Sequence, residues 1–241
     1  MPFITGGHPT LATTAAVLPA LQSAGASIVE VGIPFSDPIA DGPVIAAAMH
    51  EVLESGVTLD DVFATVARVR PTVDLGIVAM VSHSIVHRTG AEAFTASAAA
   101  AGFDGLIVPD LDLDTADGLR ALTDAAGLTL SPLVAPTTEG PRLERIVGLA
   151  TGFVYVLARA GITGESTDLP DVAGRVEALR AMTDLPLAVG FGISTAEHVR
   201  HVTRSADAAI VGSALVRRMS GPGDVVAEAG AFIGDLARGL A

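Results

Sequence analysis

The chain has 241 residues, half of them apolar, and carries a formal charge of −13 at pH 7. This charge argues against nucleic-acid binding, because phosphates require a basic surface. The sequence contains neither cysteine nor lysine, which excludes disulfides, thiolate metal sites, a cysteine nucleophile, a Schiff-base lysine and lysine-anchored pyridoxal phosphate.

Short apolar, β-branched runs alternate with alanine- and leucine-rich segments of helical period along the whole chain. The short runs predict strands at residues 2–5, 27–31, 75–81, 105–108, 128–134, 153–157, 187–189 and 208–211. The longer segments predict helices at residues 11–24, 45–55, 59–70, 91–101, 115–126, 141–149, 172–182, 196–203 and 225–240. Pro19 is expected to bend or end the first helix, and Thr58 to cap the helix at residues 59–70.

This succession of strands and helices predicts a single (β/α)8 barrel domain over residues 1–241, because eight such repeats need about 250 residues. A doubly wound sheet usually has fewer strands and a GxGxxG turn after the first one, and neither is present. No apolar run reaches the roughly 18 residues of a membrane span. The first ten residues lack the basic and apolar regions of a secretory signal, so we expect a cytoplasmic protein without membrane contact.

Two carboxylates stand out in the segment 26–45. Alternation along a barrel strand directs Glu30 into the lumen together with Ile28 and Gly32, whereas Val29 faces the helices. A carboxylate among apolar layers costs several kcal/mol unless it is paired or used. Asp41 lies in a following loop rich in proline and glycine, where an Asp-Gly turn is the alternative explanation.

Three glycine-containing segments follow the last three predicted strands, at residues 159–167, 190–194 and 211–216. Loops after the late strands of such barrels commonly bind phosphate, because glycine lets backbone N–H groups approach the anion. The segment 158–170 is long enough for a mobile lid, with an ordinary polar loop as the alternative. The histidine pairs at 83/87 and 198/201 lack convincing carboxylate partners, so we expect no metal site.

The run VEVGIPFSDPIADGP, at residues 29–43, closely resembles the signature of the tryptophan synthase alpha subunit family. The similarity continues through PFITGGHP, FVYVLARAGITG, GFGIS and IVGSALV, in the same order along nearly the whole chain. The resemblance implies a (β/α)8 lyase that cleaves indole-3-glycerol phosphate to indole and glyceraldehyde 3-phosphate in tryptophan biosynthesis.

The resemblance also implies residue roles. Glu30 matches the family's general acid/base, Asp41 matches the aspartate beside the indole N–H, and Thr163 matches the lid threonine that closes onto it. The positions matching the phosphate-binding residues are Gly164, Gly192, Gly212 and Ser213. The positions matching pocket-lining residues are Phe3, Tyr155 and Phe191.

The chemistry explains why two different carboxyls are wanted. Cleavage requires a proton at indole C3 while the side-chain hydroxyl loses one, so one carboxyl must titrate near neutrality and the other must stay ionised. An apolar lumen raises the pKa of Glu30, and a polar loop is expected to leave that of Asp41 low. The indole ring is the electron sink, so we expect neither metal nor cofactor in this chain.

Two departures from the family pattern bear on partners. The chain begins almost at the first strand, without the family's extra N-terminal helix, and the segment MVSHSIVHRTG replaces the usual Tyr and Asn-Pro after the third strand. The family's loop there faces a beta subunit that uses pyridoxal phosphate. We therefore expect an alpha2beta2 partnership, with a free-standing lyase or a non-catalytic activating subunit as alternatives.

Overall fold

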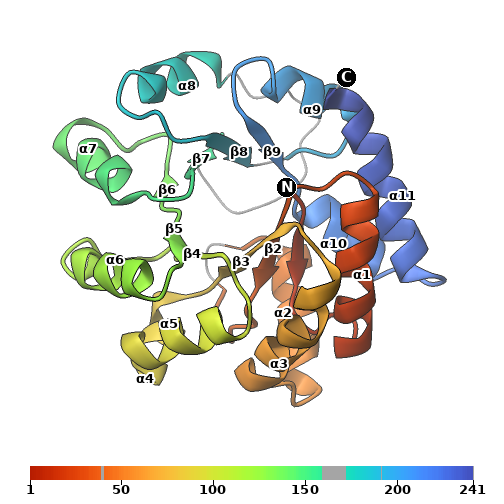
Figure 1. Cartoon of the computed structure of the whole chain (residues 1–241). Helices are drawn as coiled ribbons and strands as arrows, with labels where there is room; N and C mark the ends of the chain where they lie inside the picture. Colours follow the sequence, from red (N-terminus) through yellow and green to blue (C-terminus); the bar gives the residue numbers. More distant parts are fainter. Residues whose placement is uncertain (39–40, 159–171, 191, 241) are drawn as a thin grey trace.

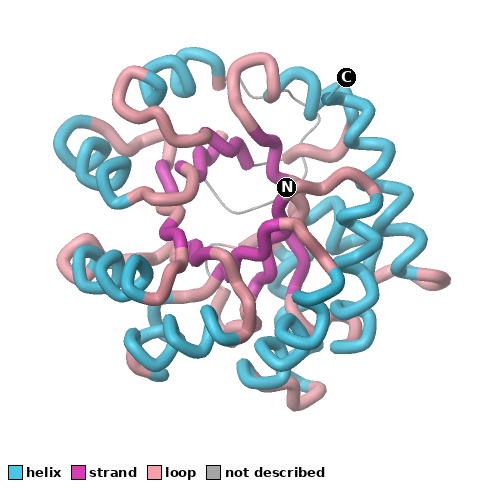
Figure 2. The backbone as a smooth tube through the Cα atoms, viewed as in Figure 1, coloured by secondary structure: helices cyan, strands magenta, loops and turns pink. Residues whose placement is uncertain are grey.

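The computed structural model describes residues 1–38, 41–158, 172–190 and 192–240, and in it parallel strands form a central barrel surrounded by helices (Figures 1 and 2). The strands are β1 (Phe3–Thr5), β2 (Ile28–Gly32), β3 (Gly76–Met80), β4 (Gly105–Ile107), β5 (Thr129–Leu130), β6 (Leu133–Val134), β7 (Val154–Leu157), β8 (Leu187–Gly190) and β9 (Ala208–Ile210). Neighbouring strands pair in sequence order, from β1 to β5 and from β6 to β9. A parallel bridge between Pro2 and Val211 joins the two ends, which confirms the predicted barrel.

The strand predicted at residues 128–134 is wrong as a continuous element, because it is interrupted at Ser131 and Pro132 between β5 and β6. Proline has no amide hydrogen to donate to a ladder. Backbone bonds still hold the break in place, with Ser131 N donating to Leu106 O at 2.9 Å and Tyr155 N donating to Pro132 O at 3.0 Å. The two short strands therefore occupy one position of the barrel.

The helices are α1 (Leu11–Ser23), α2 (Pro43–Glu54), α3 (Leu59–Val69), α4 (His83–Thr89), α5 (Ala91–Ala100), α6 (Ala116–Ala125), α7 (Gly140–Leu149), α8 (Ala173–Arg180), α9 (Ala196–Val202), α10 (Ser213–Met219) and α11 (Val225–Ala237). Two single 3-10 turns, η1 (Arg70–Thr72) and η2 (Arg238–Leu240), follow α3 and α11. The helix α1 continues past Pro19 to Ser23, so the proline does not end it. None of the described helices is long and apolar enough to cross a membrane.

Local sequence explains why α3 begins where it does. Thr58 Oγ1 accepts a hydrogen bond from Asp61 N at 3.3 Å, and the Asp61 carboxylate accepts one from Thr58 N at 2.9 Å. This reciprocal capping box satisfies two backbone N–H groups that have no partner within the helix. The predicted N-cap is thus confirmed. The Thr58 hydroxyl, which also donates to the Asp61 carboxylate at 2.7 Å, and the Thr58 N–H together lower the pKa of Asp61.

The strands have two differently packed faces. Val29 and Val31 belong to the apolar layer between barrel and helices. Ile28, on the other face of β2, packs with lumen residues from other strands, including Val78 and Tyr155. The alternation predicted for β2 is therefore confirmed, and it places Glu30 in the lumen.

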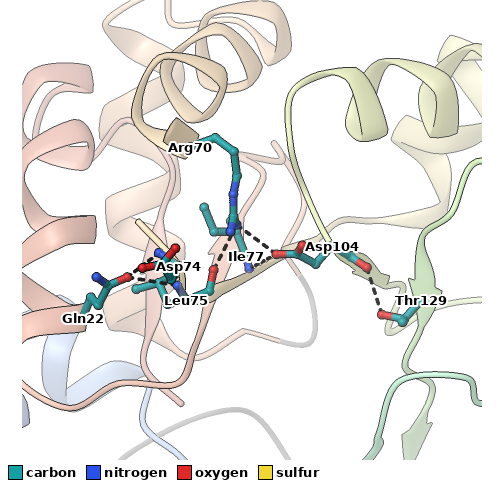
Figure 3. Close-up of polar contacts among 7 residues, drawn as sticks. All are labelled: Gln22, Arg70, Asp74, Leu75, Ile77, Asp104 and Thr129. Carbon is teal, nitrogen blue, oxygen red and sulfur yellow. Dashed lines mark hydrogen bonds and ion pairs between the residues drawn. The ribbon is translucent and has the colours of Figure 1, made fainter. Parts of the chain in front are cut away.

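Side-chain clamps join neighbouring strands at their amino-terminal ends (Figure 3). The Asp104 carboxylate, just before β4, accepts hydrogen bonds from Ile77 N at 2.7 Å and from Arg70 Nη1 at 3.0 Å. Arg70 also donates to Leu75 O at 2.9 Å, so one aspartate and one arginine fix the start of β3 against β4. Gln22 Oε1 accepts from Leu75 N at 3.0 Å and ties α1 to the same place.

The same clamp recurs on the opposite side of the barrel. Asp207, just before β9, accepts a hydrogen bond from Leu187 N at 2.7 Å and pairs with Arg180. A cavity of about 460 Å³ opens at this end of the barrel, lined in part by Met1, Ile28 and Phe153. This end lies opposite the loop that carries Asp41, so the cavity and that loop are at different ends of the barrel.

Candidate functional site

Glu30 is the most deeply placed ionisable side chain of the candidate site. It lies in the middle of β2, opposite Phe3 of β1 and Val78 of β3, and is completely buried. Neither carboxylate oxygen has a hydrogen-bond partner among the residues that the structure describes. Burial raises the pKa of Glu30 to about 8, and the Met1 ammonium offsets part of that effect. The carboxyl is therefore largely protonated at pH 7 and able to act as an acid.

Asp41 lies in the loop between β2 and α2, at the carboxyl-terminal end of the strands. Its N–H donates to Pro38 O at 3.1 Å, and Pro43 begins α2 two residues later. The expectation of a low pKa for Asp41 is wrong, because burial raises the pKa of this carboxyl to about 6. At pH 7 the carboxylate form still predominates by roughly ten to one. Glu30 and Asp41 thus keep the different protonation states that the chemistry requires.

Tyr155 is a buried aromatic side chain of the barrel lumen. It lies in the lumen on β7, and its pKa is raised well above its ordinary value by burial, then by the charges of Glu30 and Asp41. A Cβ at Gly190 would lie 2.4 Å from the Tyr155 hydroxyl oxygen, so only glycine leaves room for it.

Phe3 occupies a similar place on β1. A Cβ at Gly32 would lie 2.4 Å from its ring, so a second glycine accommodates a second aromatic side chain. Phe3 packs with Ile45 of α2 and Val216 of α10. Phe3, Tyr155 and Glu30 thus belong to the lumen, and Asp41 lies in the loop that follows β2.

Gly212 and Ser213 stand at the beginning of α10. Leu215 N and Val216 N donate to Gly212 O at 2.9 and 3.1 Å. The preceding N–H groups of Ser213 and Ala214 have no acceptor within the helix, as at any helix start. A Cβ at Gly212 would lie 3.8 Å from Phe3 Cβ, which places this backbone beside the aromatic part of the site.

Gly192 has a left-handed backbone with φ of +70°, which favours glycine. Its carbonyl oxygen lies 3.2 Å from Nδ1 of His198, the residue that also lies 3.4 Å from Ser194 N. His198 therefore contacts the backbone of the predicted anion-binding loop. Thr163, Gly164 and Phe191 lie outside the described residues, as does nearly all of the predicted lid.

Sequence reasoning missed Thr5. It is two residues beyond Phe3 on β1, so alternation directs it to the lumen, and it is completely buried. Its hydroxyl has no hydrogen-bond partner within the described part of the chain. The signal was present in the sequence, because the same alternation that located Glu30 applies to β1.

The segment after β3 differs from the expected loop, since it forms α4. Ser82 Oγ donates to the Asp110 carboxylate at 2.8 Å, and His83 N donates to it at 2.7 Å. Within the described residues, no group of three or more His, Asp or Glu side chains is placed to hold a metal ion. Asp110 therefore joins the segments after β3 and β4 as a hydrogen-bond acceptor.

Comparisons with known proteins agree over almost the full chain. A family model described as tryptophan synthase alpha chain matches residues 1–231. A tryptophan synthase alpha chain from a Synechococcus species is 45% identical over 240 residues, covering 98% of this chain and 89% of that protein. The Chloroflexus aurantiacus protein of the same name is 44% identical and covers 100% of this chain and 92% of its own length.

Solved structures give the same answer for the fold. The Mycobacterium tuberculosis tryptophan synthase has a TM-score of 0.89 and 36% identity, covering 99% of this chain and 90% of that one. The tryptophan synthase A-subunit of Pyrococcus furiosus has a TM-score of 0.90 and 32% identity, covering 98% and 96%. These similarities extend over strands and helices alike.

Proposed function

Since the chain belongs to the tryptophan synthase alpha chain family, we propose that Glu30 and Asp41 carry the family's reaction in it. The chain is a lyase of tryptophan biosynthesis that cleaves indole-3-glycerol phosphate to indole and glyceraldehyde 3-phosphate. The observation that supports these two residues is the pair of unequal carboxyls in one site, with pKa values of about 8 and about 6.

Glu30 acts in this proposal as the general acid and base. The protonated carboxyl donates to indole C3, the bond between C3 and the glycerol carbon breaks, and the electron pair of that bond stays with the indole ring. The hydroxyl on the glycerol carbon loses its proton as the aldehyde forms. One proton is added and one removed, so a single carboxyl can return to its starting state.

Asp41 stabilises the other end of the ring. Protonation at C3 places positive charge on the indole nitrogen, and a carboxylate that accepts a hydrogen bond from the N–H favours this charge. Tyr155 and Phe3 are proposed to line the pocket. The ring itself takes up the electron pair, so the proposed steps need no cofactor in this chain.

The phosphate of the substrate is proposed to bind at the glycine segments after the late strands. Backbone N–H groups at Gly192, Gly212 and Ser213 supply donors from the described part, and a left-handed or side-chain-free backbone allows their approach. Gly164 is proposed to add a fourth position, Thr163 to close onto Asp41, and Phe191 to line the pocket. Binding energy from the phosphate then positions the indole against Glu30.

A tryptophan synthase beta subunit that holds pyridoxal phosphate is the proposed partner, in an alpha2beta2 complex. The similarity to the Mycobacterium tuberculosis tryptophan synthase supports this partnership. The second candidate is a free-standing lyase, which the altered segment at Ser82, Ser84 and Ile85 favours. The two are separated by co-elution with a beta chain and by the turnover of the isolated chain compared with that of the mixture.

The experiment that tests the catalytic proposal measures indole release from indole-3-glycerol phosphate by the purified chain. Asp41→Asn keeps the size of the side chain and removes its charge, so the rate should fall by about 10² or more. Release that is independent of Asp41 would refute its role. A chain that releases no indole but activates a beta subunit would instead be a non-catalytic subunit.

A further inference from the structure

His8 is a buried histidine to which the proposed mechanism gives no role. It lies in the turn between β1 and α1, and only 2% of its surface is exposed. Its Nε2 lies 2.9 Å from Ser220 Oγ, directly after α10, and its Nδ1 lies 3.4 Å from a carboxylate oxygen of Glu51 in the last turn of α2. One imidazole ring therefore contacts the carboxyl-terminal ends of two helices.

The hydrogen bonds define the tautomer of this ring. Ser220 Oγ lies 3.0 Å from Val216 O, a carbonyl that can only accept, so the Ser220 hydroxyl uses its proton there. Ser220 Oγ must then accept from His8, which places the imidazole proton on Nε2. Burial lowers the pKa of His8, against an opposing effect of Glu51, which favours this neutral form. His8 is thus a directed donor to the end of α10, whereas its Nδ1 lies beside Glu51 without a hydrogen-bond partner among the described residues.

The helices that His8 contacts also pack against each other. Ala48 and Met49 of α2 share a buried cluster with Val216 of α10 and with Phe3. At their amino-terminal ends, α2 begins two residues after Asp41 and α10 begins directly after Gly212. The amino-terminal ends of α2 and α10 therefore lie beside Asp41 and Gly212, whereas their carboxyl-terminal ends lie beside the imidazole ring of His8.

We propose that His8 is a positioning residue: by donating to Ser220 it holds the end of α10, against which α2 packs, and thereby sets the distance between the Asp41 carboxylate and the backbone at Gly212. This inference rests on the proposed function, because that distance matters only if one substrate spans both places. A substrate bound at both ends tolerates little error, and displacement by about 1 Å can cost 10²-fold in rate. His8 acts in this way without touching substrate.

The test compares variants of the complete chain. His8→Leu removes the N–H donor at similar volume, and Ser220→Ala removes its acceptor at the end of α10 with little effect on packing. Both should lower kcat for indole release by about tenfold or more. Inorganic phosphate, tested as a competitive inhibitor, should bind each variant as tightly as the wild type, since it needs only the anion site.

Two further variants separate positioning from general structure. His8→Gln keeps an N–H donor for Ser220 and should restore most of kcat, and the double variant of His8→Leu with Ser220→Ala should be no worse than either single change. His50→Leu, on the exposed face of α2, is the matched control and should leave kcat unchanged, since its side chain is 71% exposed.

Folded His8→Leu and Ser220→Ala proteins with wild-type kcat would overturn the inference. Equal losses in kcat and phosphate affinity, or additive losses in the double variant, would also overturn it, because they indicate general loosening of the fold. If the wild type releases no indole, the proposed function and this inference are both refuted. If the wild type is active and the variants are unaffected, only the inference is refuted.

Discussion

The buried carboxyl of Glu30 should make the protein less stable as the pH rises, and Glu30→Gln should remove that dependence. The pKa of Glu30 is about 8 in the folded chain against an ordinary value of 4.5. Between these values the unfolded chain has released the proton that the folded chain still holds. The folded state binds more protons, so its free energy of unfolding falls by ~1.4 kcal/mol per pH unit from this group alone.

At pH 7 the accumulated loss amounts to roughly 3 kcal/mol, a large share of the stability of a typical domain. A glutamine cannot ionise, so the variant lacks the term at every pH. Its amide is also buried without the partners that it needs, which adds a cost that does not depend on pH. We therefore predict that the free energy of unfolding depends on pH with different slopes in the two proteins. We make no prediction about the pH-independent difference between them.

The assay is urea unfolding at several pH values from 5 to 8, followed by circular dichroism, because the sequence contains no tryptophan and only one tyrosine. The wild-type free energy of unfolding should decline relative to that of Glu30→Gln by ~1.4 kcal/mol per pH unit. Glu177→Gln, an exposed position on α8, should run parallel to the wild type. Parallel curves for Glu30→Gln as well would refute the raised pKa and with it the acid role.

Three other predictions concern the pH dependence of kcat/KM, the room that Gly190 leaves for Tyr155, and the stabilising role of Asp104. The value of kcat/KM should fall below about pH 6, as Asp41 takes up a proton, and above about pH 8, as Glu30 loses one, and Asp41→Asn should abolish the acidic limb of a steady-state pH profile. Gly190→Ala should lower kcat about tenfold or more, because its Cβ would lie 2.4 Å from the Tyr155 hydroxyl and displace it, as an indole-release assay would show. Asp104→Ala should lower the free energy of unfolding by about 1–3 kcal/mol in urea titrations, since it leaves a partly buried N–H without an acceptor.

Matched controls make these outcomes interpretable. Gly234→Ala, inside α11 with open space around its Cβ position, should leave kcat unchanged and stabilise the helix by roughly 0.5–1 kcal/mol. Asp124→Ala removes a surface pair with Arg120 and should cost about 0.5 kcal/mol or less. If Asp104→Ala costs no more than Asp124→Ala, the clamp has no stabilising role. An unchanged kcat in Gly190→Ala would mean that the Tyr155 hydroxyl is not needed.

Sequence reasoning located those features that depend on period and on local hydrogen bonding. Alternation along β2 placed Glu30 in the lumen, and the residues flanking Thr58 defined the start of α3. The helices α4 and α10 were missed, and α4 is held by tertiary contacts, such as those of Ser82 and His83 with Asp110. Such contacts join segments that are distant in sequence, and no local pattern encodes them.

The electrostatic environment was predictable only in part. A strand position was enough to infer that burial raises the pKa of Glu30. The loop carrying Asp41 has a polar, proline-rich sequence that suggests solvent contact, yet the folded chain buries the carboxyl enough to raise its pKa to about 6. His8 illustrates the same limit, because its two partners lie on helices that follow β2 and β9, far away in the sequence.

The most direct test of this account is the rate of indole release from indole-3-glycerol phosphate by the purified wild type and by Glu30→Gln. The account predicts that the wild type releases indole and that kcat of the variant is lower by ~10²–10⁴, the range expected for loss of a general acid and base. A Glu30→Gln protein with an unimpaired kcat would contradict the account, since the proton at C3 would then come from another group.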